Sequence, residues 1–115
     1  MNISVTELQG ARAVKINVTD AVLRVELADG RTLTVPTAWY PRLTHGSSRE
    51  RNHWQLIGDG VGIHWPELDE DISVEGLLAG RRSGETPQSL KRWLNVRLSV
   101  RAGRSTKAMS RKARR

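Results

Sequence analysis

Two neighbouring segments that alternate apolar and polar residues constrain the fold more than any other feature of this sequence. Residues 23–27 read Leu-Arg-Val-Glu-Leu and residues 33–35 read Leu-Thr-Val, the period-2 pattern of half-buried β-strands. A two-residue loop between them would place charged residues on the apolar face, because a slip of one residue moves every side chain to the other face. A three-residue loop pairs Val25 with Leu33 and keeps that face apolar. The pattern therefore predicts an antiparallel hairpin whose loop ends at Gly30 in the left-handed conformation.

Shorter patterns predict the other elements of an α+β fold. Residues 14–18 repeat the alternation and predict a third strand, and short strands are expected at 55–57 and 61–65. Helical segments are predicted at 49–54 with Ser47 or Ser48 as the N-cap, at 73–79 with Ser73 as the N-cap and Gly80 after its end, and at 87–96 with Thr86 as the N-cap. We expect a small antiparallel or mixed sheet of four or five strands, built on the hairpin and packed by short helices.

The charge of the chain is divided between two regions of opposite sign. Residues 1–80 contain seven Lys and Arg against eleven Asp and Glu, whereas residues 81–115 contain twelve Lys and Arg against the single Glu85. Such a division is typical of a folded domain followed by an arm that binds a polyanion or a protein partner.

The charge pattern and the helical signals together suggest a boundary between domain and arm. We assign residues 1–96 to one domain and residues 97–115 to a basic tail. Apolar and polar residues alternate from 94 to 101, a pattern typical of a strand, although the N-cap upstream predicts a helix. The conformation of 97–101 therefore stays open. Residues 102–115 have no apolar periodicity and are expected to lack regular structure when unbound.

The composition excludes several classes of protein. A chain of 115 residues suits a single domain, and the absence of Cys excludes disulfides, thiolate metal sites and cysteine nucleophiles. No apolar run approaches the roughly 18 residues that span a bilayer. The first seven residues lack the basic and apolar regions of a signal peptide. We therefore expect a cytoplasmic protein that makes no membrane contact.

No motif predicts catalysis, a cofactor or a metal site. His45, His53, His64 and the carboxylates at 69–71 include the atoms for a metal site, but no local spacing places two ligands together. The three consecutive carboxylates are explained more simply by the positive end of a helix dipole, or as an acidic patch for a basic partner. The glycines of segment 58–62 lack the strand-loop-helix context of a phosphate loop and predict a turn.

Two longer blocks resemble a known family. The first covers 27–36 with 39–43, and the second reads Gly-Val-Gly-Ile-His-Trp-Pro-Glu-Leu-Asp-Glu-Asp-Ile-Ser-Val-Glu-Gly-Leu-Leu-Ala-Gly over 60–80. Across roughly residues 13–82 the chain resembles the domain of unknown function 2442 family of small bacterial α+β proteins. The resemblance implies a small mixed sheet with one or two helices and no established activity or cofactor. Some relatives are linked to toxin–antitoxin-like gene pairs, and some carry a helix-turn-helix that is not recognisable in this sequence.

These observations lead to three hypotheses about function. The first is a non-enzymatic binding module, an antitoxin-like or regulatory protein that binds a small basic protein through an acidic patch and DNA or RNA through its tail. The patch consists of His64, Trp65, Asp69, Glu70, Asp71 and Glu75. The tail cations are Lys91, Arg92, Arg97, Arg101, Arg104, Lys107, Arg111, Lys112, Arg114 and Arg115.

The second hypothesis is an accessory protein that binds nucleic acid through the tail alone, by counterion release and without reading sequence. A tail that serves only solubility is the alternative to both. The third, remote hypothesis is a small enzyme that uses His64 and the neighbouring carboxylates. A homodimer is also expected, because short sheets with exposed edges often pair with a second copy.

Overall fold

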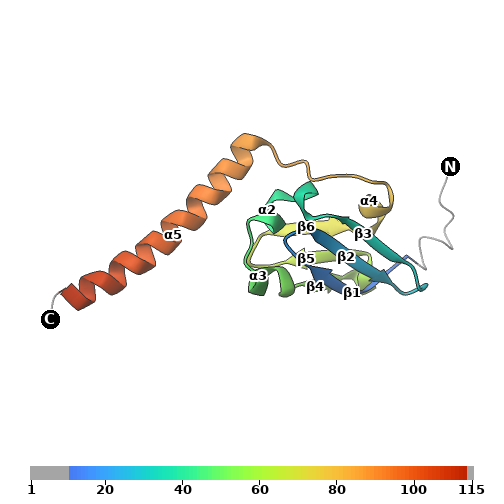
Figure 1. Cartoon of the computed structure of the whole chain (residues 1–115), viewed down its shortest axis with the longest axis horizontal. Coiled ribbons are helices and arrows are strands. Elements are labelled where there is room, and N and C mark those ends of the chain that lie inside the picture. Colours follow the sequence, from blue (N-terminus) through green and yellow to red (C-terminus); the bar gives the residue numbers. More distant parts are fainter. Residues whose placement is uncertain (1–10, 114–115) are drawn as a thin grey trace. The chain divides into compact units, whose positions relative to one another are not determined.

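The first sheet consists of three consecutive antiparallel strands, β1 (Ala13–Val18), β2 (Val22–Leu27) and β3 (Thr32–Pro36). The computed structural model describes residues 11–113 (Figure 1). Side chains are described only as far as residue 100. Val25 lies opposite Leu33, and the amide of Leu27 donates to the carbonyl of Arg31 at 2.8 Å. Gly30 has a φ of 92°. The predicted register, the three-residue loop and the positive φ of its glycine are therefore confirmed.

The second sheet is formed by β4 (Gln55–Ile57), β5 (Gly62–Trp65) and β6 (Glu70–Ser73), again antiparallel. The sequence predicted the first two of these strands but not β6. We expected the carboxylates at 69–71 to precede a helix and to stabilise its dipole, and this was wrong for Glu70 and Asp71, which lie in the strand. Only Ile72 of β6 is apolar and buried, so this strand has no alternation that a sequence reading could detect.

Gly60 lies where the segment between β4 and β5 packs against the first sheet. It ends the short 3₁₀ turn η2 (Gly58–Gly60) with a φ of 99°, and a Cβ built there would lie 2.4 Å from the carbonyl oxygen of Ala13. The backbone of η2 thus packs directly against β1. Only glycine combines this positive φ with such a close backbone approach.

The core is formed by the buried faces of both sheets and by the segments that cover them. Leu23 of β2 and both Ile63 and Trp65 of β5 are fully buried. The covering residues are Leu43, Leu68, Val74 and Leu77. Each fully buried side chain of this size contributes about 1.5–3 kcal/mol to stability, as an upper estimate.

Besides η2, four short helical segments pack around the strands, namely η1 (Thr37–Trp39), α2 (Pro41–Thr44), α3 (Ser48–Asn52) and α4 (Val74–Leu78). Ser47 is the N-cap of α3, and it forms a capping box with Glu50 through hydrogen bonds of 3.1 and 2.9 Å. Ser73 caps α4 by accepting a hydrogen bond from the amide of Gly76. The predicted caps of both helices are confirmed.

The last element is the long helix α5 (Pro87–Ala113), which belongs to a second compact unit that begins at Glu85. Its predicted start is confirmed, because the amide of Ser89 donates to the Thr86 hydroxyl at 3.0 Å. Its predicted end at 96 was wrong, because the helix continues to Ala113. Most residues from 101 to 113 are Arg, Lys, Ala and Met, which have high helix propensity, and no proline interrupts them. The α+β class is confirmed, with the strands divided between two sheets instead of one.

Candidate functional sites

Strands β5 and β6 bring together two residues of the predicted acidic patch. His64 lies directly opposite Asp71 in the antiparallel register, and the His64 Nδ1 is hydrogen-bonded to the Asp71 Oδ1. The His64 side chain is 32% exposed and that of Asp71 is 70% exposed. The pair therefore lies at the surface, where cross-strand pairs contribute about 0.2–1 kcal/mol.

Trp65 does not belong to this surface. Its side chain has no solvent exposure, and its indole Nε1 donates to the carbonyl of Arg51 at 2.9 Å. The prediction that Trp65 contacts a partner was therefore wrong. Successive side chains of a β-strand point to opposite faces of the sheet. His64 therefore reaches solvent while Trp65, the next residue, fills the core.

The remaining carboxylates of the patch differ in their surroundings. The Arg42 Nη1 donates to the Asp69 carbonyl at 2.9 Å and lies 3.4 Å from the Asp69 Oδ2. Glu70 accepts a hydrogen bond of 3.1 Å from the amide of Asp71. Glu75 is exposed in the first turn of α4. Because the Arg42 guanidinium already lies against Asp69, this surface offers a basic partner less negative charge than the sequence suggests.

A second polar cluster, which the sequence reading missed, is centred on Glu67. Its Oε2 accepts from the Arg49 Nη2 at 2.8 Å, and its Oε1 lies 2.6 Å from the His53 Nδ1. Arg49 lies in α3, His53 follows the end of this helix, and Glu67 lies in the turn between β5 and β6. Their separation in sequence follows no motif, so only the tertiary structure brings them together.

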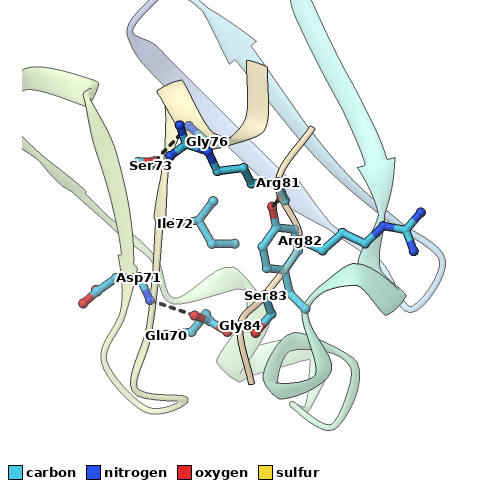
Figure 2. A pocket seen from close by; sticks show the side chains of 10 residues that line it. Glu70, Asp71, Ile72, Ser73, Gly76, Arg81, Arg82, Ser83 and Gly84 are labelled. Carbon is cyan, nitrogen blue, oxygen red and sulfur yellow. Dashed lines mark hydrogen bonds between the residues drawn. The ribbon is translucent and has the colours of Figure 1, made fainter. Parts of the chain in front are cut away.

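The cavity shown in Figure 2 has a volume of about 220 Å³ and lies between β6, α4 and the segment 81–84. The Tyr40 hydroxyl donates to the carbonyl of Arg81 at 2.8 Å, and the amide of Ser83 donates to the carbonyl of Trp39 at 3.1 Å. The Arg82 guanidinium lies over the Trp39 ring, 4.7 Å from its centroid. These contacts hold the segment 81–84 against the body of the protein.

The structure perturbs the ionisation of Tyr40, one of the residues that line this cavity. Burial raises the pKa of the Tyr40 hydroxyl, and the negative charge of Glu70 raises it further. The hydroxyl is therefore held in its neutral, hydrogen-bonding form. This arrangement favours a structural role for Tyr40, which fixes the segment that leads to α5.

Two of the polar side chains that line the cavity, those of Asp71 and Ser73, are directed away from it or already hydrogen-bonded. Figure 2 shows the carboxylate of Asp71 directed away from the cavity, and His64 is not among the lining residues. The Ser73 hydroxyl accepts the amide hydrogen bond that caps α4. Within residues 11–100, no group of three His, Asp or Glu side chains is arranged to hold a metal ion.

The predicted tail cations lie on α5, except Arg114 and Arg115, which fall outside the described residues. The helix contains Lys91, Arg92, Arg97, Arg101, Arg104, Lys107, Arg111 and Lys112. It contains neither Asp nor Glu. The Arg97 guanidinium lies over the Trp93 ring at 4.6 Å from its centroid, while Lys91 and Arg92 are exposed. Among the described helices, none is long and apolar enough to cross a membrane.

Comparison with known proteins places the body of the protein in a family. Residues 13–83 match the family described as protein of unknown function (DUF2442). The chain belongs to this family. The resemblance seen in the sequence is therefore confirmed, and the DUF2442 match ends just before the unit that contains α5.

Two solved structures are similar to this DUF2442 protein. A protein of unknown function from Rhodospirillum rubrum is 32% identical over 64% of this chain and 92% of its own, with a TM-score of 0.56. An uncharacterised protein from Chromobacterium violaceum is 22% identical over 73% of this chain and 90% of its own, with a TM-score of 0.55. The second likeness concerns the fold alone. No curated protein matches the chain.

Proposed function

We propose that this DUF2442 protein is a non-enzymatic binding protein that contacts the phosphates of nucleic acids through α5 without reading their sequence. The observation that carries the proposal is a helix of 27 residues with eight Lys and Arg and no acidic residue. Cations grouped in this way attract phosphates chiefly through the release of condensed counterions.

The charge of α5 is not balanced within its own unit. The single acidic residue after residue 80, Glu85, accepts a hydrogen bond from the Ser89 hydroxyl in the first turn. Further along, Arg97 and Arg101 are four residues apart, as are Lys107 and Arg111. Like charges at this spacing destabilise a helix by about 0.2–0.5 kcal/mol per pair. A bound polyanion relieves this repulsion, so phosphate binding and helix stability support each other.

The acidic patch gives less support to the role of an antitoxin-like partner protein. Trp65 is buried, and both Asp69 and Asp71 lie against basic groups of the body. A catalytic role has similarly little support, since the Asp71 carboxylate that pairs with His64 points away from the cavity (Figure 2). The helix is therefore the stronger basis for a function.

Two full-length double variants test the proposal, because they remove equal charge from different places. Arg104→Gln with Arg111→Gln changes α5, and Gln has nearly the helix propensity of Arg. Lys15→Gln with Arg24→Gln changes two exposed residues of the first sheet and serves as the matched control. Binding to a fluorescently labelled 20-base-pair duplex of arbitrary sequence is measured by anisotropy.

We expect the α5 variant to bind about tenfold or more weakly at 100 mM salt, and its slope of log K against log[salt] to be smaller by about 2. The control variant should bind like the wild type. Equal losses in both variants would mean that net charge alone matters, and absence of binding by the wild type would refute the proposal. Tight binding to one sequence in preference to others would show that the protein reads bases.

A further inference from the structure

Strand β3 forms one edge of the first sheet, where it pairs with β2 (Figure 1). The amide of Leu27 donates to the carbonyl of Arg31 at 2.8 Å, so these two residues form a hydrogen-bonded pair where the β2–β3 ladder begins. Hydrogen-bonded and non-hydrogen-bonded pairs alternate along an antiparallel ladder, so the odd-numbered residues of β3 bond to β2. Its even-numbered residues direct their backbone groups away from the sheet, and these are Thr32, Thr34 and Pro36.

Thr32 and Thr34 each present one N–H and one C=O group at this edge. Both residues are exposed, and within residues 11–113 no hydrogen bond joins their backbone to a segment outside the sheet. Between them, Leu33 is only half-buried, although its partner Val25 on β2 is fully buried. The edge therefore offers four unused hydrogen-bonding groups and an incompletely covered apolar side chain.

The two edges of the first sheet differ in how they are protected against pairing with another strand. At the opposite edge, β1 carries the exposed Lys15, and its register with β2 shifts between Ala13 and Lys15. Lysines and bulges of this kind commonly protect edge strands. Over Thr32–Pro36, β3 has neither a charged residue nor a register shift, and its proline stands last, after the free groups of Thr34. Strand β3 is therefore open to pairing.

We infer that β3 pairs with β3 of a second copy of this chain, antiparallel and about a twofold axis at Leu33. Thr32 then lies opposite Thr34 of the second copy, and each such pair exchanges two hydrogen bonds, so all the free groups of both residues are used. Leu33 lies opposite Leu33 of the second copy, in a non-hydrogen-bonded pair, where side chains approach most closely. The two sheets join into one of six strands. This inference goes beyond the proposed function and does not depend on it.

The charges beside the edge favour a second copy as the occupant. On the face that bears the two threonines, Glu26 of β2 lies beside Thr32 and Arg24 lies beside Thr34. The twofold axis at Leu33 aligns Glu26 of each copy with Arg24 of the other, across the two central strands. The backbones at the ends of each row lie about 14 Å apart, a distance that the two long side chains can largely span. An axis at Thr34 would instead align Arg24 with Arg24.

A backbone variant tests the pairing. Thr34→Pro removes an N–H that bonds only to the second copy, and proline is tolerated where an edge strand faces solvent. Thr34→Val keeps the N–H and the branched side chain, and it serves as the matched control. Two paired strands of five residues cover less than the roughly 1,200 Å² of a standard interface, so we expect a weak dimer that dissociates in the micromolar range. Sedimentation velocity of the full-length proteins from about 5 to about 500 μM covers this range.

A charge swap tests the register without touching the backbone, and it decides the question if Thr34→Pro does not fold. Arg24→Glu places like charges at the ends of each row. Adding Glu26→Arg restores opposite charges and the net charge of the wild type. We expect Arg24→Glu to weaken the dimer about threefold or more, and the double variant to recover it.

For the backbone variants, we expect the wild type and Thr34→Val to dimerise alike and Thr34→Pro to do so at least about tenfold more weakly. A wild type that stays monomeric throughout, or a dimer that a folded Thr34→Pro leaves unchanged, would overturn the inference. Failure of the double charge variant to recover would overturn the axis at Leu33. Growth beyond a dimer would show that β3 joins a different strand and would also overturn it. None of these results bears on duplex binding, which tests the proposed function separately.

Discussion

Substitution of Gly60 by alanine tests how the two sheets are joined. The φ of 99° costs an L-residue about 1–2 kcal/mol, as in the left-handed region. The new methyl group would also lie 2.4 Å from a backbone oxygen of β1, which cannot rotate away. Overpacking of this kind adds about 1–3 kcal/mol. We therefore expect Gly60→Ala to lower the free energy of unfolding by about 2–5 kcal/mol.

Two other glycines separate the backbone strain from the steric clash. Gly30 has a φ of 92° and no atom within 4 Å of a built Cβ, so Gly30→Ala should cost only the strain, on the order of 1 kcal/mol. Gly30→Asn should cost less, because Asn tolerates this conformation better. Gly84 has neither a positive φ nor a near neighbour, so Gly84→Ala should be neutral or slightly stabilising.

Urea unfolding measured by tryptophan fluorescence compares the series, since Trp65 is buried in the native state. Thermal midpoints give a second measure, with about 4–8 °C expected per kcal/mol for a domain of this size. Equal costs for Gly60→Ala and Gly30→Ala would refute the close packing of η2 against β1. Equal stability of Gly30→Ala and wild type would refute the positive φ in the hairpin loop.

Two further predictions concern individual hydrogen bonds. Ser47→Ala removes the capping box of α3 and should lower the unfolding free energy by about 1 kcal/mol in urea titrations, whereas an unchanged midpoint would argue against the cap. Tyr40→Phe removes the bond to Arg81 and should cost about 0.5–1.5 kcal/mol near neutral pH. Because the folded-state pKa of Tyr40 is raised, the wild type should lose stability as the pH rises above about 10, and its advantage over Tyr40→Phe should shrink there. A difference that stays constant up to pH 11 would contradict this reasoning.

The hairpin and the helix caps could be predicted because each depends on residues close together in sequence. Register followed from keeping Leu23, Val25 and Leu27 on one face, and the caps followed from Ser47 and Ser73 standing before helical segments. Strand β6 could not be predicted in this way, because its pairing with β5 is set by tertiary contacts around a single apolar residue, Ile72.

The candidate sites show the same limit. The cations of the tail were evident from composition, but the continuation of the helix through Ala113 was not. The sequence also placed Trp65 beside His64 on one patch, whereas the pleat of β5 directs the two side chains to opposite faces. The cluster around Glu67 joins residues that are up to 18 positions apart, so no local spacing could indicate it.

The salt dependence of duplex binding by the full-length wild-type protein tests most directly whether α5 binds phosphates. Contact with five or six phosphates predicts that log K falls linearly with log[salt] with a slope of about −4.5 to −5.5, whatever the duplex sequence. A titration from 50 to 300 mM salt with two unrelated duplexes measures this slope. We expect the plots of log K against log[salt] for the two duplexes to be parallel lines with that slope. A slope near zero, or no measurable binding at 50 mM salt, would contradict it.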